Sequence, residues 1–168
     1  MNYQELEKWL SSFLLTDEEK MDKLRKYQSF LLLSNKQFNL TGITDPNEML
    51  IKHFYDSLSP LEHLSIADKK VLDFGSGAGF PGLPFAIFMP HVTLLDATKK
   101  KCDFLAECVK LLGLKNVEVV HSRGEEFIAR ESFDVVTARA VAALPILLEL
   151  IAPLLKVGGL FLAMKGAN

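Results

Sequence analysis

The sequence predicts an α/β fold with a mostly parallel sheet, flanked by helices and preceded by a helical N-terminal segment. From about residue 70, short apolar runs alternate with amphipathic segments, which is typical of a parallel sheet covered on both faces. A glycine-rich stretch follows the first apolar run, and an acidic residue, Asp96, ends the second. Because ligands of such sheets bind at the carboxyl ends of the strands, both features indicate a ligand site at one edge.

The first 68 residues are predicted to be helical. Apolar residues recur at helical spacing within residues 3–14, and Thr16–Glu19 resembles a capping box that begins a second helix. Asp45 and Pro46 supply an N-cap and a first-turn proline for a third helix that runs to about Leu58. We expect residues 1–68 to form a helical N-terminal extension packed on the core.

The remaining residues, 69–168, are expected to form that core. Strands are expected near 70–74, 92–96, 117–120, 133–138 and 159–164. Helices are expected near 81–89, 98–112 and 143–155, with a short helix or turn around 124–129. No repeat and no linker long enough to separate two domains interrupts this pattern, so we expect one structural unit.

The composition is that of a soluble globular protein. Of 168 residues, 49% are apolar and 24% are charged, and no apolar run approaches the length of a membrane span. The start of the chain lacks the basic and apolar regions of a signal peptide, so we expect a cytoplasmic protein with no membrane partner. The net charge of −2 hides a split: residues 1–68 carry 7 Lys and Arg against 11 Asp and Glu, and residues 69–168 carry 12 against 10. Any surface for a polyanion is expected in the second part.

The stretch Val71–Gly82 reads as a strand, a tight turn and the start of a helix. Gly75, Gly77 and Gly79 stand at alternate positions after the apolar run, where positive φ angles and a close approach to a ligand require glycine. Pro81 suits a first helical position. A helix N-terminus behind such a turn presents free N–H groups to a carboxylate or phosphate.

Two ligand classes fit this turn. The letters from Gly77 to Gly82 satisfy G-x-G-x-x-G, but a dinucleotide site needs its first glycine directly at the end of the strand. The frame Asp73-x-Gly75-x-Gly77-x-Gly79 fits better and is typical of S-adenosylmethionine (SAM) methyltransferases. A glycine turn without any ligand is a further reading of the same letters.

Other polar residues fall where the next strands end. Asp96 lies 21 residues after Gly75, where an acidic side chain reaches ribose hydroxyls in either ligand class. Lys99–Lys101 follow it, and they form either a solvated helix start or a track for an RNA backbone. After the third strand, the main chain of Gly124 and Glu125 is placed to frame an adenine edge.

Arg139 ends the fourth predicted strand in an otherwise small and apolar stretch, and a buried cation there is costly unless it is paired. We therefore interpret Arg139 as functional. Lys165 follows the fifth strand, and its position is a weaker indication of function than that of Arg139. His53 and Asp56 are expected on or near one face of the third helix, while Asp73 is expected to be buried and to orient the glycine turn.

No pattern predicts a metal site. The histidines have no ligand spacing, and Cys102 and Cys108 lie six apart, on different faces of a helix. No arrangement predicts covalent catalysis either.

Several separate motifs together resemble a known family. They are Asn39–Ile43, His53–Leu58, Val71–Gly82, Leu95–Asp96, His121–Phe127, Ala138–Ala140 and Lys165–Gly166. In this order they resemble the bacterial small-subunit rRNA methyltransferase G family, also called glucose-inhibited division protein B. The match runs from about Asn35 to the last residue.

The resemblance implies a Rossmann-like, SAM-dependent methyltransferase that acts on N7 of a guanine in the decoding-region loop of 16S rRNA, presented as RNA, as the small ribosomal subunit or as its precursor. The cofactor contacts that it implies, together with the glycine turn, are Gly75, Gly77, Gly79, Phe80, Asp96, Gly124, Glu125 and Arg139. The substrate-pocket candidates are Arg139, His53, Asp56, Asn39 and Lys165. No residue is expected to act as a proton-transfer catalyst.

The sequence departs from the family at two places. Ser34 stands where the family often has Trp, and the chain ends soon after the fifth strand, so we expect the hairpin that closes the sheet to be absent and an edge to be exposed. An NAD-dependent oxidoreductase and a noncatalytic RNA-binding or regulatory module that retains the fold remain the alternatives. The oligomeric state is left open.

Overall fold

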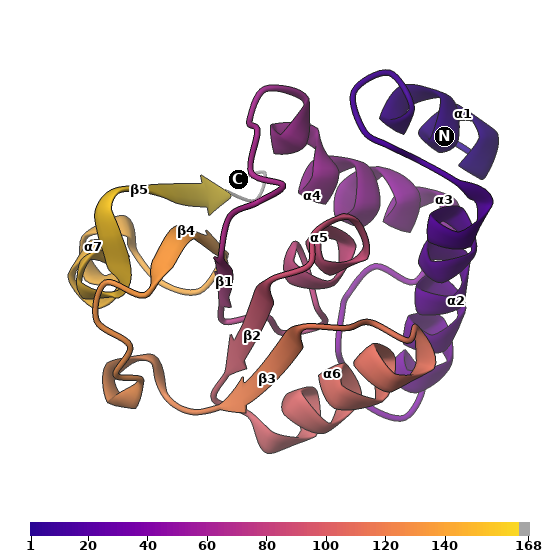
Figure 1. Ribbon diagram of the computed structural model, residues 1–168. Helices are drawn as coiled ribbons and strands as arrows, with labels where there is room; N and C mark the ends of the chain where they lie inside the picture. Colours follow the sequence, from indigo (N-terminus) through magenta and orange to yellow (C-terminus); the bar gives the residue numbers. More distant parts are fainter. Residues whose placement is uncertain (165–168) are drawn as a thin grey trace.

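The computed structural model describes residues 1–164 as one sheet with helices on both faces (Figure 1). All five strands are parallel and pair in the order β3-β2-β1-β4-β5. They are β1 (Val71–Phe74), β2 (Val92–Asp96), β3 (Val117–His121), β4 (Phe133–Arg139) and β5 (Leu155–Met164). The predicted parallel sheet is therefore confirmed. The chain leaves β1 toward β2 and β3 on one side and returns to β4 on the other, which places the switch point beside β1.

The N-terminal part is helical, as predicted. It contains α1 (Tyr3–Leu10), α2 (Glu18–Asn35), α3 (Pro46–Met49), the π-helix η1 (Leu50–Tyr55), α4 (Asp56–Leu58) and the 3₁₀-helix η2 (Ser59–Glu62). The first helix ends at Leu10, earlier than expected. The capping box lies at its start, where Asn2 and Glu5 bond reciprocally, rather than at Thr16. Asp17 caps α2 by accepting the N–H of Lys20 at 2.9 Å.

The helices of the core are α5 (Gly82–Phe88), α6 (Lys99–Leu111), η3 (Gly124–Glu126), α7 (Leu144–Ile151) and η4 (Ala152–Leu154). Helix α5 begins one residue after Pro81, which is the N-cap. The last predicted helix ends early because Pro153 has no N–H to continue the α-helical bonds. Strand β5 then begins at Leu155 rather than near 159, with an irregular register around Gly158, whose φ is 78°.

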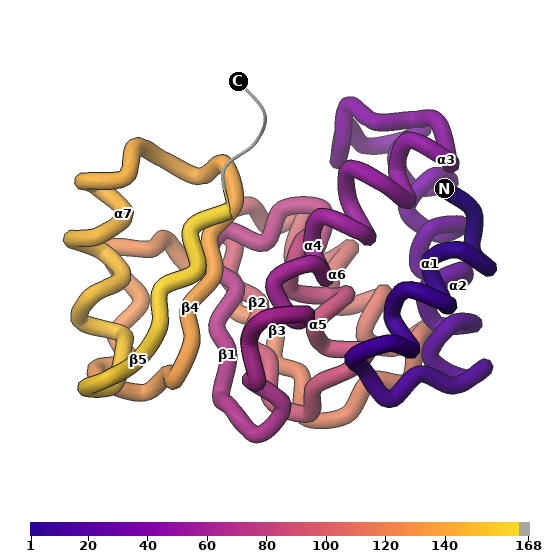
Figure 2. The backbone as a smooth tube through the Cα atoms, turned by 90° about the horizontal axis from the view of Figure 1, so that it is seen from above, coloured from indigo at the N-terminus to yellow at the C-terminus, as the bar shows by residue number. Residues whose placement is uncertain are grey.

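Two apolar layers cover the sheet. Figure 2 shows α7 on one face and α5, α6 and the N-terminal helices on the other. Val71 belongs to the larger cluster, with α2, α5 and α6, whereas its neighbour Leu72 packs with Leu147 and Ile151 of α7. Successive strand residues point to opposite faces, so a strand buried on both faces reads as a continuous apolar run. The N-terminal helices thus complete the larger layer.

Candidate functional site

The glycine loop leaves β1 at the switch point and is bonded to β2. The N–H groups of Gly75 and Ser76 both donate to the carbonyl of Leu95, at 2.8 and 2.9 Å. Gly75, Gly77 and Gly79 have φ angles of 75°, 57° and 103°, so the predicted positive angles are confirmed. A side chain at these positions would strain the turn.

Asp73 holds the end of this loop that leads into α5. It is fully buried, as predicted; one carboxylate oxygen accepts the N–H of Gly82 at 2.9 Å, and the other accepts the hydroxyl of Thr137 at 3.0 Å. Burial raises the pKa of Asp73 to about 6. Its two bonds join β1 to the start of α5 and to β4, which supports an orienting role.

Asp96 holds the middle of the loop. Its Oδ2 accepts the N–H of Gly77 at 2.8 Å, and its Oδ1 accepts the N–H of Thr98 at 2.9 Å. Each oxygen keeps a second acceptor position. The side chain therefore has a structural task in addition to any contact with a ligand.

A cavity of about 520 Å³ opens beside the loop, within the size range of small-molecule sites. It lies at the carboxyl ends of β1, β2 and β4. Its walls are Leu40, Thr41, His53, Gly75, Ser76, Gly77, Ala78, Phe80, Asp96, Ala97, Lys101, Arg139, Ala140 and Val141. Six predicted site residues therefore meet in one cavity: His53, Gly75, Gly77, Phe80, Asp96 and Arg139.

Arg139 enters this cavity from the end of β4. Its Nη2 donates to the carbonyl of Lys52 at 2.8 Å and to Nδ1 of His53 at 3.2 Å. Its Nη1 is buried and has no hydrogen-bond partner within residues 1–164. Burial lowers the pKa of Arg139 from its usual value, although the group stays cationic. A buried, unpaired N–H on a cation favours an acceptor supplied by a ligand.

His53 lies beside Arg139 in the same cavity. Its ring stacks on Phe80 with centroids 4.4 Å apart, and its Nε2 lies 2.8 Å from Oγ1 of Thr41. Burial, and next the charge of Arg139, lower the pKa of His53 to about 4. The ring is therefore neutral near pH 7.

Asp56 does not line the cavity, although its charge acts on Arg139, the partner of His53, and opposes the lowering of the Arg139 pKa. It is exposed, whereas His53 is buried. The cause is the π-helix Leu50–Tyr55, whose wider turn breaks the α-helical alignment of residues three apart.

Three other predicted residues lie outside the cavity walls. Asn39 is exposed, and its neighbours Leu40 and Thr41 line the cavity instead. A Cβ on Gly79 would lie 2.6 Å from the hydroxyl oxygen of Tyr27, so packing as well as the positive φ requires glycine there. Gly124 packs on the ring of Phe74.

Glu125 follows Gly124 in η3, which comes after β3 and also lies outside these walls. Lys165 falls outside the described residues.

The residues that the prediction missed are small or belong to a helix start. Thr41 stands in a turn-rich segment whose partner, His53, is distant in sequence, so no local spacing marks it. Lys101 lines the cavity, while Lys99 pairs with Asp103 at 2.9 Å and Lys100 lies over Phe38. The lysine triplet therefore divides into three different environments.

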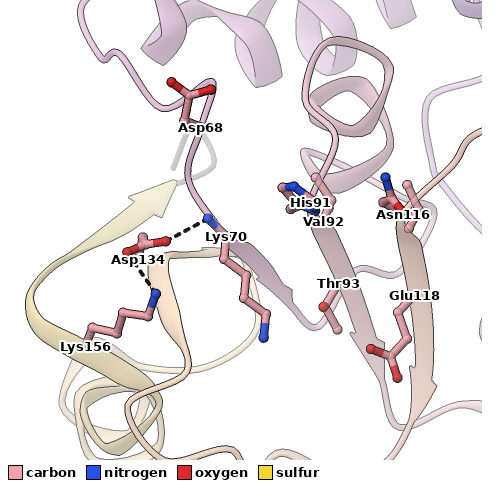
Figure 3. Close-up of a pocket in the computed structure, with 10 residues that line it drawn as sticks. Asp68, Lys70, His91, Val92, Thr93, Asn116, Glu118, Asp134 and Lys156 are labelled. Atoms are coloured by element: carbon pink, nitrogen blue, oxygen red, sulfur yellow. Dashed lines mark hydrogen bonds and ion pairs between the residues drawn. The ribbon is translucent and has the colours of Figure 1, made fainter.

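A second hollow, of about 550 Å³, lies at the amino ends of the strands (Figure 3). Asp134 lines this hollow, accepts the backbone N–H of Lys70 at 2.8 Å and pairs with Lys156 at 3.3 Å. It is on the edge of the sheet opposite the glycine loop, where parallel sheets do not normally bind ligands.

Within residues 1–164, no three His, Cys, Asp or Glu side chains gather as a metal site would require. Cys102 and Cys108 are buried, free thiols. No helix in this part of the chain is long and apolar enough to cross a membrane.

Comparisons with known proteins identify the family of the chain. Residues 20–168 match the family model of rRNA small subunit methyltransferase G. Over 156 residues the chain is 46% identical to ribosomal RNA small subunit methyltransferase G of Desulfitobacterium hafniense strain Y51, which covers 89% of this chain and 64% of that protein. It is 48% identical over 155 residues to the protein of the same name from Caldanaerobacter subterraneus, covering 88% and 65%.

The chain thus spans slightly less than two thirds of the length of these two relatives. The fold matches that of a SAM-dependent methyltransferase from Aquifex aeolicus with a TM-score of 0.57 and 24% identity, over 74% of this chain and 67% of that one. The predicted Rossmann-like methyltransferase fold is confirmed. The chain belongs to the rRNA small subunit methyltransferase G family.

Proposed function

We propose that the cavity binds SAM and that the protein methylates N7 of a guanine in the decoding-region loop of 16S rRNA. The observation that carries this proposal is the cavity at the switch point, which is lined by the glycine loop, Asp96 and Arg139, whose Nη1 has no partner within residues 1–164. The donors and acceptors match a zwitterionic methionine end and a ribose.

Each wall has a role in this proposal. The backbone of Gly75 and Gly77 lies against the ligand, and the free acceptor positions of Asp96 take ribose hydroxyls. Arg139 supplies a charge-assisted hydrogen bond to the carboxylate. Gly124, Glu125 and Phe80 complete the site, the first two toward the adenine.

The chemistry needs little from the protein beyond positioning. SAM supplies an electrophilic methyl group on a sulfonium. Guanine N7 already has an in-plane lone pair, so no proton has to be removed before attack. Neutral His53 has its Nδ1 occupied by Arg139, and Asp96 is bonded to the loop, which fits a site without a general base. The cavity then acts by alignment and by stabilising the charge that moves to the purine.

The lysines at the start of α6 are proposed to contact rRNA phosphates. The first turn of this helix has three lysines and no acidic residue, which opposes the helix dipole. Lys101 lines the cavity itself. Cations at a cofactor site favour a polyanionic substrate, and N7 is most accessible in an open loop. A ribosomal substrate would place the protein in the bacterial cytoplasm.

Calorimetric titration with S-adenosylhomocysteine and with NAD separates the methyltransferase from the oxidoreductase alternative. We expect binding of the first ligand only. Transfer of labelled methyl groups is then measured on naked 16S rRNA and on small subunits that lack the modification. Binding of S-adenosylhomocysteine and of RNA without transfer to either substrate would favour the noncatalytic module.

A further inference from the structure

The backbone of Thr41 is clamped at the mouth of the cavity. Asn35, the last residue of α2, accepts the N–H groups of Leu40 and Thr41 on its Oδ1, at 2.8 and 2.9 Å. Its Nδ2 donates to the carbonyl of Thr41 at 2.9 Å. Three bonds from one side chain therefore fix the position of this residue, although it stands in a loop.

The neighbouring bonds fix the tautomer of His53. The guanidinium of Arg139 can only donate, so Nδ1 of His53 must accept the bond from Nη2 at 3.2 Å. The ring is neutral near pH 7, because burial lowers the pKa of His53 to about 4. Its single proton therefore lies on Nε2, which donates to Oγ1 of Thr41 at 2.8 Å.

The hydroxyl of Thr41 then has one hydrogen-bonding group left, its own proton. Its oxygen accepts from Nε2 of His53 and from the N–H of Ile43, at 2.8 and 3.2 Å, which uses both acceptor positions. Its own proton has no acceptor within residues 1–164, and the side chain lines the cavity. A hydroxyl donor without an acceptor among residues 1–164 thus lines the cavity.

We propose that Thr41 binds the ligand by donating a hydrogen bond to an acceptor oxygen, and that His53 is the positioning residue that holds the hydroxyl in this orientation. This inference rests on the proposed function of the same cavity. The oxygen belongs either to the methionine carboxylate or to O6 of the target guanine. If it is O6, Thr41 also discriminates against adenine, which carries an amino group there.

Thr41→Val and Thr41→Ser form a matched pair. Valine keeps the shape but removes the hydroxyl, whereas serine keeps the hydroxyl. If the acceptor is the carboxylate, Thr41→Val weakens S-adenosylhomocysteine binding about tenfold. If it is O6, that affinity stays unchanged and the single-turnover rate falls about tenfold on RNA. Thr41→Ser stays within about threefold of the wild type in either case. Wild-type values for Thr41→Val in both assays would overturn the proposal.

His53→Gln and His53→Asn test the positioning role. A Gln amide reaches the place of Nε2 and can donate to Thr41, whereas an Asn amide reaches only the place of Nδ1. We expect His53→Gln to retain most of the Thr41-dependent affinity or rate and His53→Asn to lose it. Equal losses in the two variants, with both folded, would contradict positioning through Thr41.

Nitrogen NMR of the wild-type protein tests the tautomer without any variant or activity. We expect His53 to show an unprotonated Nδ1 and a protonated Nε2 near pH 7. A proton on Nδ1 would overturn the hydrogen-bond chain. If the tautomer is as expected but the wild type binds no S-adenosylhomocysteine and transfers no methyl group, the proposed function fails and the chain of bonds stands.

Discussion

The hydroxyl of Tyr27 donates a hydrogen bond to the carbonyl of Ala78 at 2.6 Å, which ties helix α2 directly to the glycine loop. Tyr27 is fully buried, and its ring lies 5.1 Å from that of Phe80, between centroids. The same hydroxyl occupies the space that a side chain at Gly79 would need. The N-terminal helices therefore form part of the site.

Tyr27→Phe should loosen the loop. The variant removes one hydrogen bond and leaves the Ala78 carbonyl unpaired, so we expect a loss of about 1 kcal/mol in the free energy of unfolding and weaker binding of S-adenosylhomocysteine. Tyr3→Phe is the matched control, because the hydroxyl of Tyr3 bonds Gln28 of the same helix, at 3.0 Å, and not the glycine loop. Equal effects of the two variants on ligand affinity would contradict a specific link to the loop.

Asp96→Ala should reduce both affinity and stability. Loss of a charged hydrogen bond to ribose weakens binding about tenfold or more, and loss of the bonds from Gly77 and Thr98 lowers the free energy of unfolding by about 1 to 3 kcal/mol. Asp103→Ala, on the exposed side of α6, serves as the control. Calorimetry that gives an unchanged dissociation constant for Asp96→Ala would remove this residue from the site.

Replacing Lys99–Lys101 by Gln should flatten the salt dependence of RNA binding. If all three lysines contact phosphates of an RNA loop, the slope of log affinity against log salt falls by about 2. Gln at Lys20, Lys23 and Lys26 of α2 provides a control with the same change in charge. Identical slopes for the wild type and the Lys99–Lys101 variant would show that these lysines are solvated and do not contact RNA phosphates.

His53 should make stability depend on pH. The pKa of His53 is lowered from 6.5 to about 4, so between these values the unfolded chain binds a proton that the folded protein does not. The contribution of His53 to the free energy of unfolding of the wild type should therefore fall by about 2 to 3 kcal/mol as the pH falls from about 7 to 4. Denaturant unfolding at several pH values, compared with His53→Gln, isolates the effect.

That comparison also cancels the opposite contribution of Asp73, whose pKa is raised to about 6 by burial. The folded protein binds this proton first, so acidification through that range stabilises it. A difference between wild type and His53→Gln that does not change with pH would show that His53 titrates normally.

The sheet could be predicted from the sequence because its signals are local. The apolar run Val71–Phe74, the glycines behind it and Asp96 at the next strand end mark the switch point within 26 residues. The position of Arg139 at the end of the fourth predicted strand linked it to this edge, whereas only the resemblance to a family linked His53 to the pocket. Arg139 and His53 line the same cavity as Phe80, and this arrangement depends on tertiary packing.

The rest depends on geometry that residue patterns do not encode. Nothing in Leu50–Tyr55 marks a π-helix, so the sequence does not predict that His53 is buried while Asp56 is exposed. The role of Thr41 arises from Asn35 and His53, which are six and twelve residues away on different elements. Gly79 has the same limit, because a glycine that packs against a buried tyrosine cannot be told in sequence from one that approaches a ligand.

The most direct test of the proposed function is to locate the transferred methyl group in 16S rRNA. Labelled SAM is supplied with unmodified small subunits, and the product is treated with borohydride and aniline, which cleave RNA at N7-methylguanine. We predict one labelled guanine in the decoding-region loop and cleavage at that nucleotide, both abolished by Arg139→Ala. Labelled RNA that resists cleavage, or label on another base, would contradict methylation at N7.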